Sequence, residues 1–198
     1  MKPIVLCHGT WSRFKDWHEV GSPVRNALKE RGFEVYDFLW SGYCGGFPSP
    51  VIVPKDTPEM DGRLLLWLSE GEKLALWCKD KGLEAPDLLT HSHGLQVGVF
   101  AASLGQKFDH FLSISGPVRE DMAKYRQLAK SNISRWIQVV DKEDDMTIRQ
   151  GEAFDKHLGW AYDLPEADVN IESPGYGHSG LVLDNTDWEK LGIWKALE

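Results

Sequence analysis

The sequence predicts an α/β protein with a doubly wound, mainly parallel sheet of six strands. Three observations lead to this prediction. Six short apolar runs alternate along the chain with segments that have the apolar spacing of helices. The first runs are continuously apolar, as in strands that helices cover on both faces. Polar residues follow the ends of several runs, which is where open parallel sheets bind ligands.

The expected elements follow one another without a repeat or a linker, so residues 1–198 are expected to form a single domain. Strands are predicted over residues 3–7, 33–40, a run opening after Pro86, 108–114, 135–140 and 168–172. Helices are predicted from Ser22-Pro23 to Gly32, over 58–81, after Gly94, and over 119–130 and 147–158. A last helix is expected to start at the capping box Thr186-x-x-Glu189. Residues 41–57, rich in glycine and proline, are predicted to form a long loop.

The composition excludes several classes of function. A formal net charge of -8 without a basic tract argues against binding to nucleic acid or to an anionic membrane. No run of 18 apolar residues and no signal-peptide pattern occurs, so we expect a cytoplasmic protein without stable membrane insertion. The three cysteines include no C-x-x-C pair, which argues against disulfides and cysteine zinc sites. We expect no metal and no cofactor.

The most informative stretch is Thr90-His91-Ser92-His93-Gly94, between a short apolar run and a long one. It fits a strand, a sharp turn and a helix with one hydroxyl at the apex, a relative of the nucleophile elbow G-x-S-x-G. Such a turn requires small residues two positions before and after the serine, and Thr90 is larger than the usual glycine. The elbow would expose the Ser92 hydroxyl and direct the backbone N–H of His93 at an oxyanion.

Acyl transfer through a serine also needs a base and a carboxylate that orients the base. Candidates occur in the chain order Ser92, then Asp144 or Asp145, then His178, and each group follows a predicted strand. His178 lies in a glycine-rich turn that a bulky neighbour would not obstruct.

Together with P-I-V-L-C-H-G-T at the first strand, S-I-S-G-P at residues 113–117 and G-H-S-G-L around His178, this order resembles the α/β-hydrolase superfamily. In detail the chain is similar to the small bacterial lipases and esterases that lack a lid. The resemblance implies Asp144 as the acid, three residues beyond its strand, and the backbone N–H of Thr10 as a second oxyanion donor. It implies no separate cap domain.

We therefore expect a serine esterase or lipase that acts on a small uncharged ester. An apolar acyl or aryl group could fit among aromatic residues of the first two loops, namely Trp11, Phe14, Trp17, Trp40, Tyr43 and Phe47. Thioesterase or amidase activity would use the same residues. Two other classes stay open: a metal-dependent hydrolase with His91, His93, His8 and an aspartate as ligands, and a non-catalytic interaction protein that keeps the fold.

Overall fold

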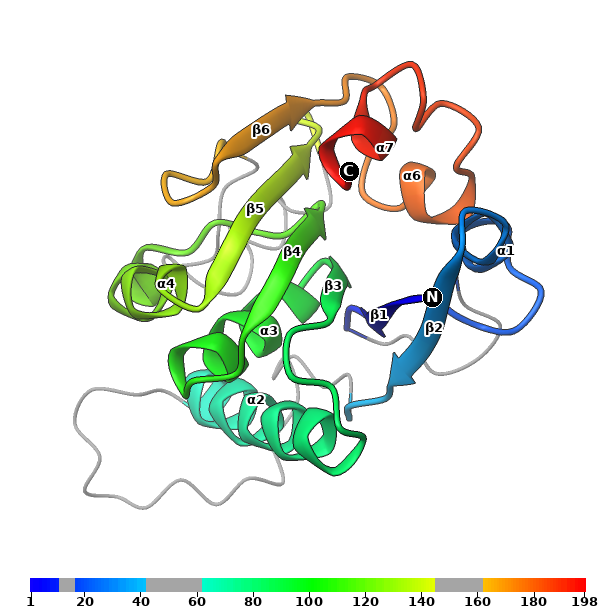
Figure 1. Ribbon diagram of the computed structural model, residues 1–198. Coiled ribbons are helices and arrows are strands. Elements are labelled where there is room, and N and C mark those ends of the chain that lie inside the picture. The colour runs from blue at the N-terminus through cyan, green and yellow to red at the C-terminus, as the bar shows by residue number, and fades with distance from the viewer. Residues whose placement is uncertain (11–16, 42–61, 145–161) are drawn as a thin grey trace.

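The computed structural model describes residues 1–10, 17–41, 62–144 and 162–198. Six strands form one sheet in the order β2-β1-β3-β4-β5-β6, and every neighbouring pair is parallel (Figure 1). The strands are β1 (Lys2–Cys7), β2 (Phe33–Phe38), β3 (Asp87–His91), β4 (Phe108–Ile114), β5 (Ile133–Val140) and β6 (Val169–Glu172). The helices are α1 (Pro23–Glu30), α2 (Gly62–Asp80), α3 (Gly94–Ser103), α4 (Ala123–Lys130) after the 3-10 turn η1 (Glu120–Met122), α6 (Gly180–Leu183) and α7 (Ile193–Ala196). The predicted fold class is confirmed.

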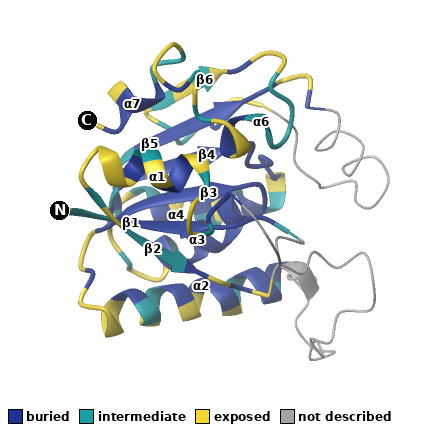
Figure 2. Ribbon diagram, turned by 90° about the vertical axis from the view of Figure 1, so that its right-hand side faces the viewer, coloured by how far each residue is buried: buried dark blue, intermediate teal, exposed yellow. Residues whose placement is uncertain are grey.

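Helical segments cover both faces of the sheet. Successive residues of a strand point to opposite faces, so each strand contributes to both. Ile4 and Leu6 pack with α1 and with the C-terminal segment that holds α6 and α7. Val5 and Cys7 pack on the other face, against α2 and α3. Figure 2 shows the central strands buried between helices whose outer sides are exposed. This burial on both faces is the physical reason why the first strand is continuously apolar.

The strand order places a topological switch at β1. The chain passes from β1 to β2 on one side and later adds β3 on the other side, with Cys7 of β1 paired to Thr90 of β3. Connections then diverge from the carboxyl ends of β1 and β3 and leave a crevice there. The predicted elbow and the His8-Gly9 loop both lie at this point.

Most strand boundaries agree with the prediction within two residues, and β4 agrees completely. The strand predicted over 33–40 ends earlier, at Phe38. The helix predicted over 119–130 begins with the 3-10 turn, and only five residues, 115–119, separate β4 from that turn. No cap domain can be inserted in that connection.

The predicted C-terminal helix is wrong in its extent. Residues 186–192 form turns rather than a helix that starts at Thr186, and the Thr186 N–H is bonded to the Asp184 carboxylate at 2.9 Å. The turn ends at Gly192, whose φ is +74°, and the Ile193 N–H bonds back to the Trp188 carbonyl at 2.9 Å. A left-handed glycine of this kind terminates a helical segment, so the apolar stripe is buried by two short pieces instead of one helix.

Several predictions lie outside the described residues. These are the loop over 42–57, the start of the second helix at 58–61, the helix over 147–158, Asp145, and the aromatic residues Trp11, Phe14, Tyr43 and Phe47. Within the described ranges, no helix is long and apolar enough to cross a membrane.

Candidate active site

Ser92 lies at a sharp reversal between β3 and α3. Its N–H still pairs with the Ile114 carbonyl of β4 at 3.1 Å, and its own carbonyl already accepts the Leu95 N–H at 3.1 Å. The chain changes from strand to helix within these few residues because Ser92 has a φ of +53°. Such values are uncommon for residues other than glycine and are found at functional turns.

The small residues around the elbow are required by close backbone contacts. A Cβ on Gly94 would lie 2.6 Å from the Cys7 carbonyl oxygen, so α3 can approach β1 only with glycine at this position. A Cβ on Gly9 would lie 2.7 Å from the Ser92 Cβ, which puts the loop after β1 directly beside the serine. Thr90, two residues before Ser92, is completely buried, so this elbow accommodates a residue larger than glycine.

Asp144 and His178 form a hydrogen-bonded pair. The Nδ1 of His178 lies 2.7 Å from the Asp144 Oδ2, and the two side chains are 13% and 2% exposed. A carboxylate only accepts hydrogen bonds, so this contact favours a proton on the Nδ1, and the lone pair of a neutral imidazole would then be on the Nε2. The pair lines a surface hollow of about 470 Å³ together with Asp141 and Gly177.

His178 lies close to the elbow. Its ring centre is 4.8 Å from that of His91, the residue that precedes Ser92. The His91 Nε2 donates a hydrogen bond to the His178 carbonyl at 2.8 Å. The structure thus places Ser92, Asp144 and His178 at the same end of the sheet, where they follow the carboxyl ends of β3, β5 and β6.

The two histidines that flank Ser92 point in different directions. His91 contacts the rings of Trp17 and His178, whereas the His93 ring stacks on Trp67 of α2 at 4.8 Å. They do not form a common ligand set, which argues against the metal-site alternative. Among the described residues, the groups close enough to share an ion are Asp87, Asp109 and His110, at the opposite edge of the sheet, and the Lys2 ammonium lies between them.

Cys7 lies next to the elbow at the end of β1. Burial, helped by the nearby Glu70 and Cys78, raises the pKa of its thiol far above the usual range. A thiol attacks as the thiolate, so Cys7 is a poor alternative to the Ser92 hydroxyl as a nucleophile.

The predicted oxyanion donors lie at the two chain segments beside Ser92. His93 is the residue before α3 and is 3% exposed, and Thr10 follows Gly9 in the loop after β1. That loop is held by the Trp40 indole, whose N–H donates to the His8 carbonyl at 2.6 Å.

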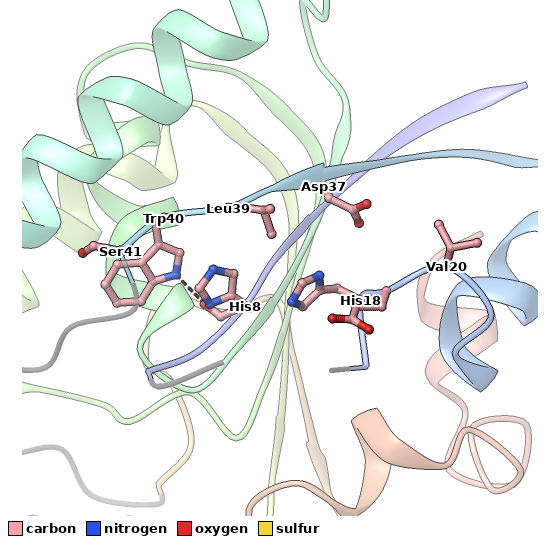
Figure 3. Close-up of a pocket in the computed structure, with 8 residues that line it drawn as sticks. His8, His18, Val20, Asp37, Leu39, Trp40 and Ser41 are labelled. Atoms are coloured by element: carbon pink, nitrogen blue, oxygen red, sulfur yellow. Dashed lines mark hydrogen bonds between the residues drawn. The ribbon is translucent and has the colours of Figure 1, made fainter. Parts of the chain in front are cut away.

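A cavity of about 600 Å³ opens beside this loop, at the carboxyl ends of β1 and β2 (Figure 3). The rings of His8, His18 and Trp40 stack along it at centre distances of 5.2 and 5.6 Å. Leu39 and Val20 are apolar lining residues, whereas Glu19 and Asp37 bring carboxylates. Trp17, expected among the pocket aromatics, is 2% exposed and belongs to the core against α1 instead.

Sequence reasoning missed the contacts of Asp141. This aspartate is 3% exposed and accepts two backbone N–H groups. The signal available in the sequence was an aspartate directly after the end of a strand, where aspartate favours bonding to the backbone of its own turn.

No protein-family model and no curated protein sequence matches the chain, but solved structures do. The lipase BlEst2 from Bacillus licheniformis has a TM-score of 0.60 and 10% identity over 98% of this chain and 91% of its own. An α/β hydrolase from a sediment metagenome of the Mar Chica lagoon has a TM-score of 0.59 and 17% identity, covering 98% and 90%. A predicted CIB-like hydrolase from Thermoplasma acidophilum has a TM-score of 0.58 and 14% identity, covering 98% and 84%. The chain has the α/β-hydrolase fold along almost its whole length.

Proposed function

We propose that the protein is a serine hydrolase that cleaves carboxylic esters, with Ser92 as nucleophile, His178 as base and Asp144 as the acid that orients the base. The observation that carries the proposal is the 2.7 Å contact between the His178 Nδ1 and Asp144, on the same edge of the sheet as the strained Ser92. This contact leaves the His178 Nε2 as the proton acceptor that a serine nucleophile needs.

In the proposed reaction, the Ser92 Oγ attacks the ester carbonyl carbon while the His178 Nε2 takes the hydroxyl proton. The backbone N–H groups of His93 and Thr10 stabilise the oxyanion of the tetrahedral intermediate, and one such donor is worth about 2.7–4 kcal/mol in the transition state. The imidazolium then gives its proton to the alkoxide oxygen as the ester C–O bond breaks, so the alcohol leaves and an acyl-enzyme remains. Water, deprotonated by His178, hydrolyses the acyl-enzyme and regenerates Ser92.

The cavity beside the loop after β1 is the proposed site for part of the ester. Its imidazoles and carboxylates favour a short or polar group there over a long alkyl chain, which modifies the expectation of a purely apolar pocket. A panel of p-nitrophenyl esters of increasing acyl length tests this preference. Thioesters and amides in the same panel test the substrate variants that would use the same three residues.

The reaction class is tested with a fluorophosphonate, which forms a covalent adduct with an activated serine. We expect one adduct, mapped to Ser92 by peptide mass spectrometry, and no effect of a metal chelator. Ser92→Ala should remove the adduct and lower kcat by about 10⁴ to 10⁶. The matched control is Ser115→Ala, because Ser115 is also buried and has a φ of +52°. Labelling that persists in Ser92→Ala, or kcat near wild type in that variant, would refute the proposal.

A further inference from the structure

We infer that Asp141 and His91 are positioning residues that hold the turn carrying His178 in place. The inference rests on the proposed function only in naming His178 as the base. Neither residue takes part in the bond-making steps above. Both bind the backbone of residues 177–178 through buried side chains that come from other elements of the fold.

The Asp141 carboxylate joins the two turns that carry the acid and the base. One oxygen accepts the Glu143 N–H at 3.0 Å, within the turn that leads from β5 to Asp144. The other oxygen accepts the Gly177 N–H at 2.8 Å, one residue before His178. A single carboxylate therefore fixes the distance between the backbone on either side of the Asp144–His178 contact.

His91 holds the same turn from the direction of the nucleophile. Its Nε2 carries a proton, because its partner at 2.8 Å is the His178 carbonyl, which can only accept. His91 is the last residue of β3, is 7% exposed and directly precedes Ser92. This hydrogen bond thus connects the peptide of the proposed base to the strand that presents the proposed nucleophile.

The turn needs these contacts because its own backbone constrains it little. Pairing with β5 ends where the Ser173 N–H meets the Val140 carbonyl at 2.9 Å. Gly175 and Gly177 follow, both with positive φ, and glycine is the residue with the most conformational freedom to lose. Two backbone hydrogen bonds across the turn are long: the Tyr176 N–H lies 3.5 Å from the Ser173 carbonyl and the Gly180 N–H lies 3.2 Å from the Tyr176 carbonyl. The shorter bonds from the Asp141 and His91 side chains, at 2.8 Å each, therefore add to the order of the turn.

Loss of the Asp141 carboxylate should misplace the imidazole without removing it. Displacement of a catalytic group by about 1 Å can cost about 10²-fold in rate. We expect Asp141→Ala to lower kcat about 10- to 100-fold and to change KM much less. Asp141→Asn should have an intermediate effect, because its amide has one oxygen for two N–H donors. His91→Ala should resemble Asp141→Ala, whereas His91→Gln keeps an N–H donor and should restore part of kcat.

The test combines steady-state kinetics with proton NMR of the His178 Nδ1–H, which should give a downfield signal that His178→Ala removes. We expect this signal to broaden through faster exchange with water in Asp141→Ala. The control is Asp184→Ala, because the Asp184 Oδ1 also accepts a backbone N–H, from Thr186 at 2.9 Å, within its own loop. The control should keep both kcat and the signal.

Unchanged kcat and an unchanged Nδ1–H signal in Asp141→Ala and His91→Ala would overturn the inference, as would a fall in kcat with the signal intact. If Asp141→Ala does not fold, Asp141→Asn and His91→Gln give the same comparison. The NMR signal does not require Ser92 to react. A wild-type protein that hydrolyses no ester and binds no fluorophosphonate would therefore refute the proposed function, while the signal would still decide the positioning role.

Discussion

The backbone of Ser92 gives a prediction that separates stability from catalysis. Its φ of +53° lies in the left-handed region, where the Cβ of a residue other than glycine is crowded by the following carbonyl. Replacement of Ser92 by glycine removes this strain together with the hydroxyl, whereas alanine removes only the hydroxyl. We therefore expect Ser92→Gly to be inactive and yet more stable than Ser92→Ala.

The expected difference follows from two opposing terms. Relief of the left-handed strain is worth about 1–2 kcal/mol. The greater freedom of glycine in the unfolded chain costs roughly 0.5–1 kcal/mol. At the middle of these ranges the net gain in free energy of unfolding is about 0.75 kcal/mol, which corresponds to about 1.5–3 °C in Tm for a chain of this length.

Urea and thermal denaturation of the two variants measure this difference, with a fluorophosphonate assay in parallel. Ser115 is the matched control, because its φ is +52° at the end of β4, where its N–H pairs with the Val139 carbonyl at 2.9 Å. Ser115→Gly should gain a similar stability and keep its activity. A Ser92→Gly variant that is no more stable than Ser92→Ala would refute the reasoning that the elbow stores strain.

Three further predictions use other contacts. Asp144→Asn should lower kcat roughly 10⁴-fold in steady-state assays, as removal of the orienting carboxylate does in other triads. A decrease in kcat of less than tenfold would exclude Asp144 as the acid. Gly94→Ala should lower the free energy of unfolding, measured with urea, by about 1–3 kcal/mol or more, because the new Cβ meets the Cys7 carbonyl oxygen. A variant as stable as wild type would contradict the close approach of α3 to β1. The Lys2 ammonium lowers the pKa of the Asp109 carboxyl. The pair should therefore stabilise the folded protein fully at pH values above the ordinary carboxyl pKa, and this stabilisation should be lost as the pH falls through the lowered pKa. Wild type and Asp109→Asn should thus differ in stability at neutral pH and converge in acid, and a constant difference from neutral pH to below about pH 3 would contradict the pairing.

The sequence by itself determined features that depend on neighbours along the chain. Continuous apolar runs indicated strands buried on both faces, and β4 has the predicted limits. The pattern around Ser92 indicated a tight turn, because Gly94 must let α3 pass close to β1. Local signals also conflicted at the C-terminus, where the break at Gly192 prevailed over the capping box at Thr186.

Only the tertiary structure decided which distant side chains meet. His178 is 34 residues from Asp144 in the chain and 87 from His91, and it contacts both because β6 lies next to β5 and its following turn leads back toward β3. The same path brings the Gly177 N–H to the Asp141 carboxylate. Contacts of this kind depend on strand order and on the direction of a glycine-rich turn. Neither leaves a periodic signal in the sequence, because many residue pairs have suitable chemistry and only the folded chain selects among them.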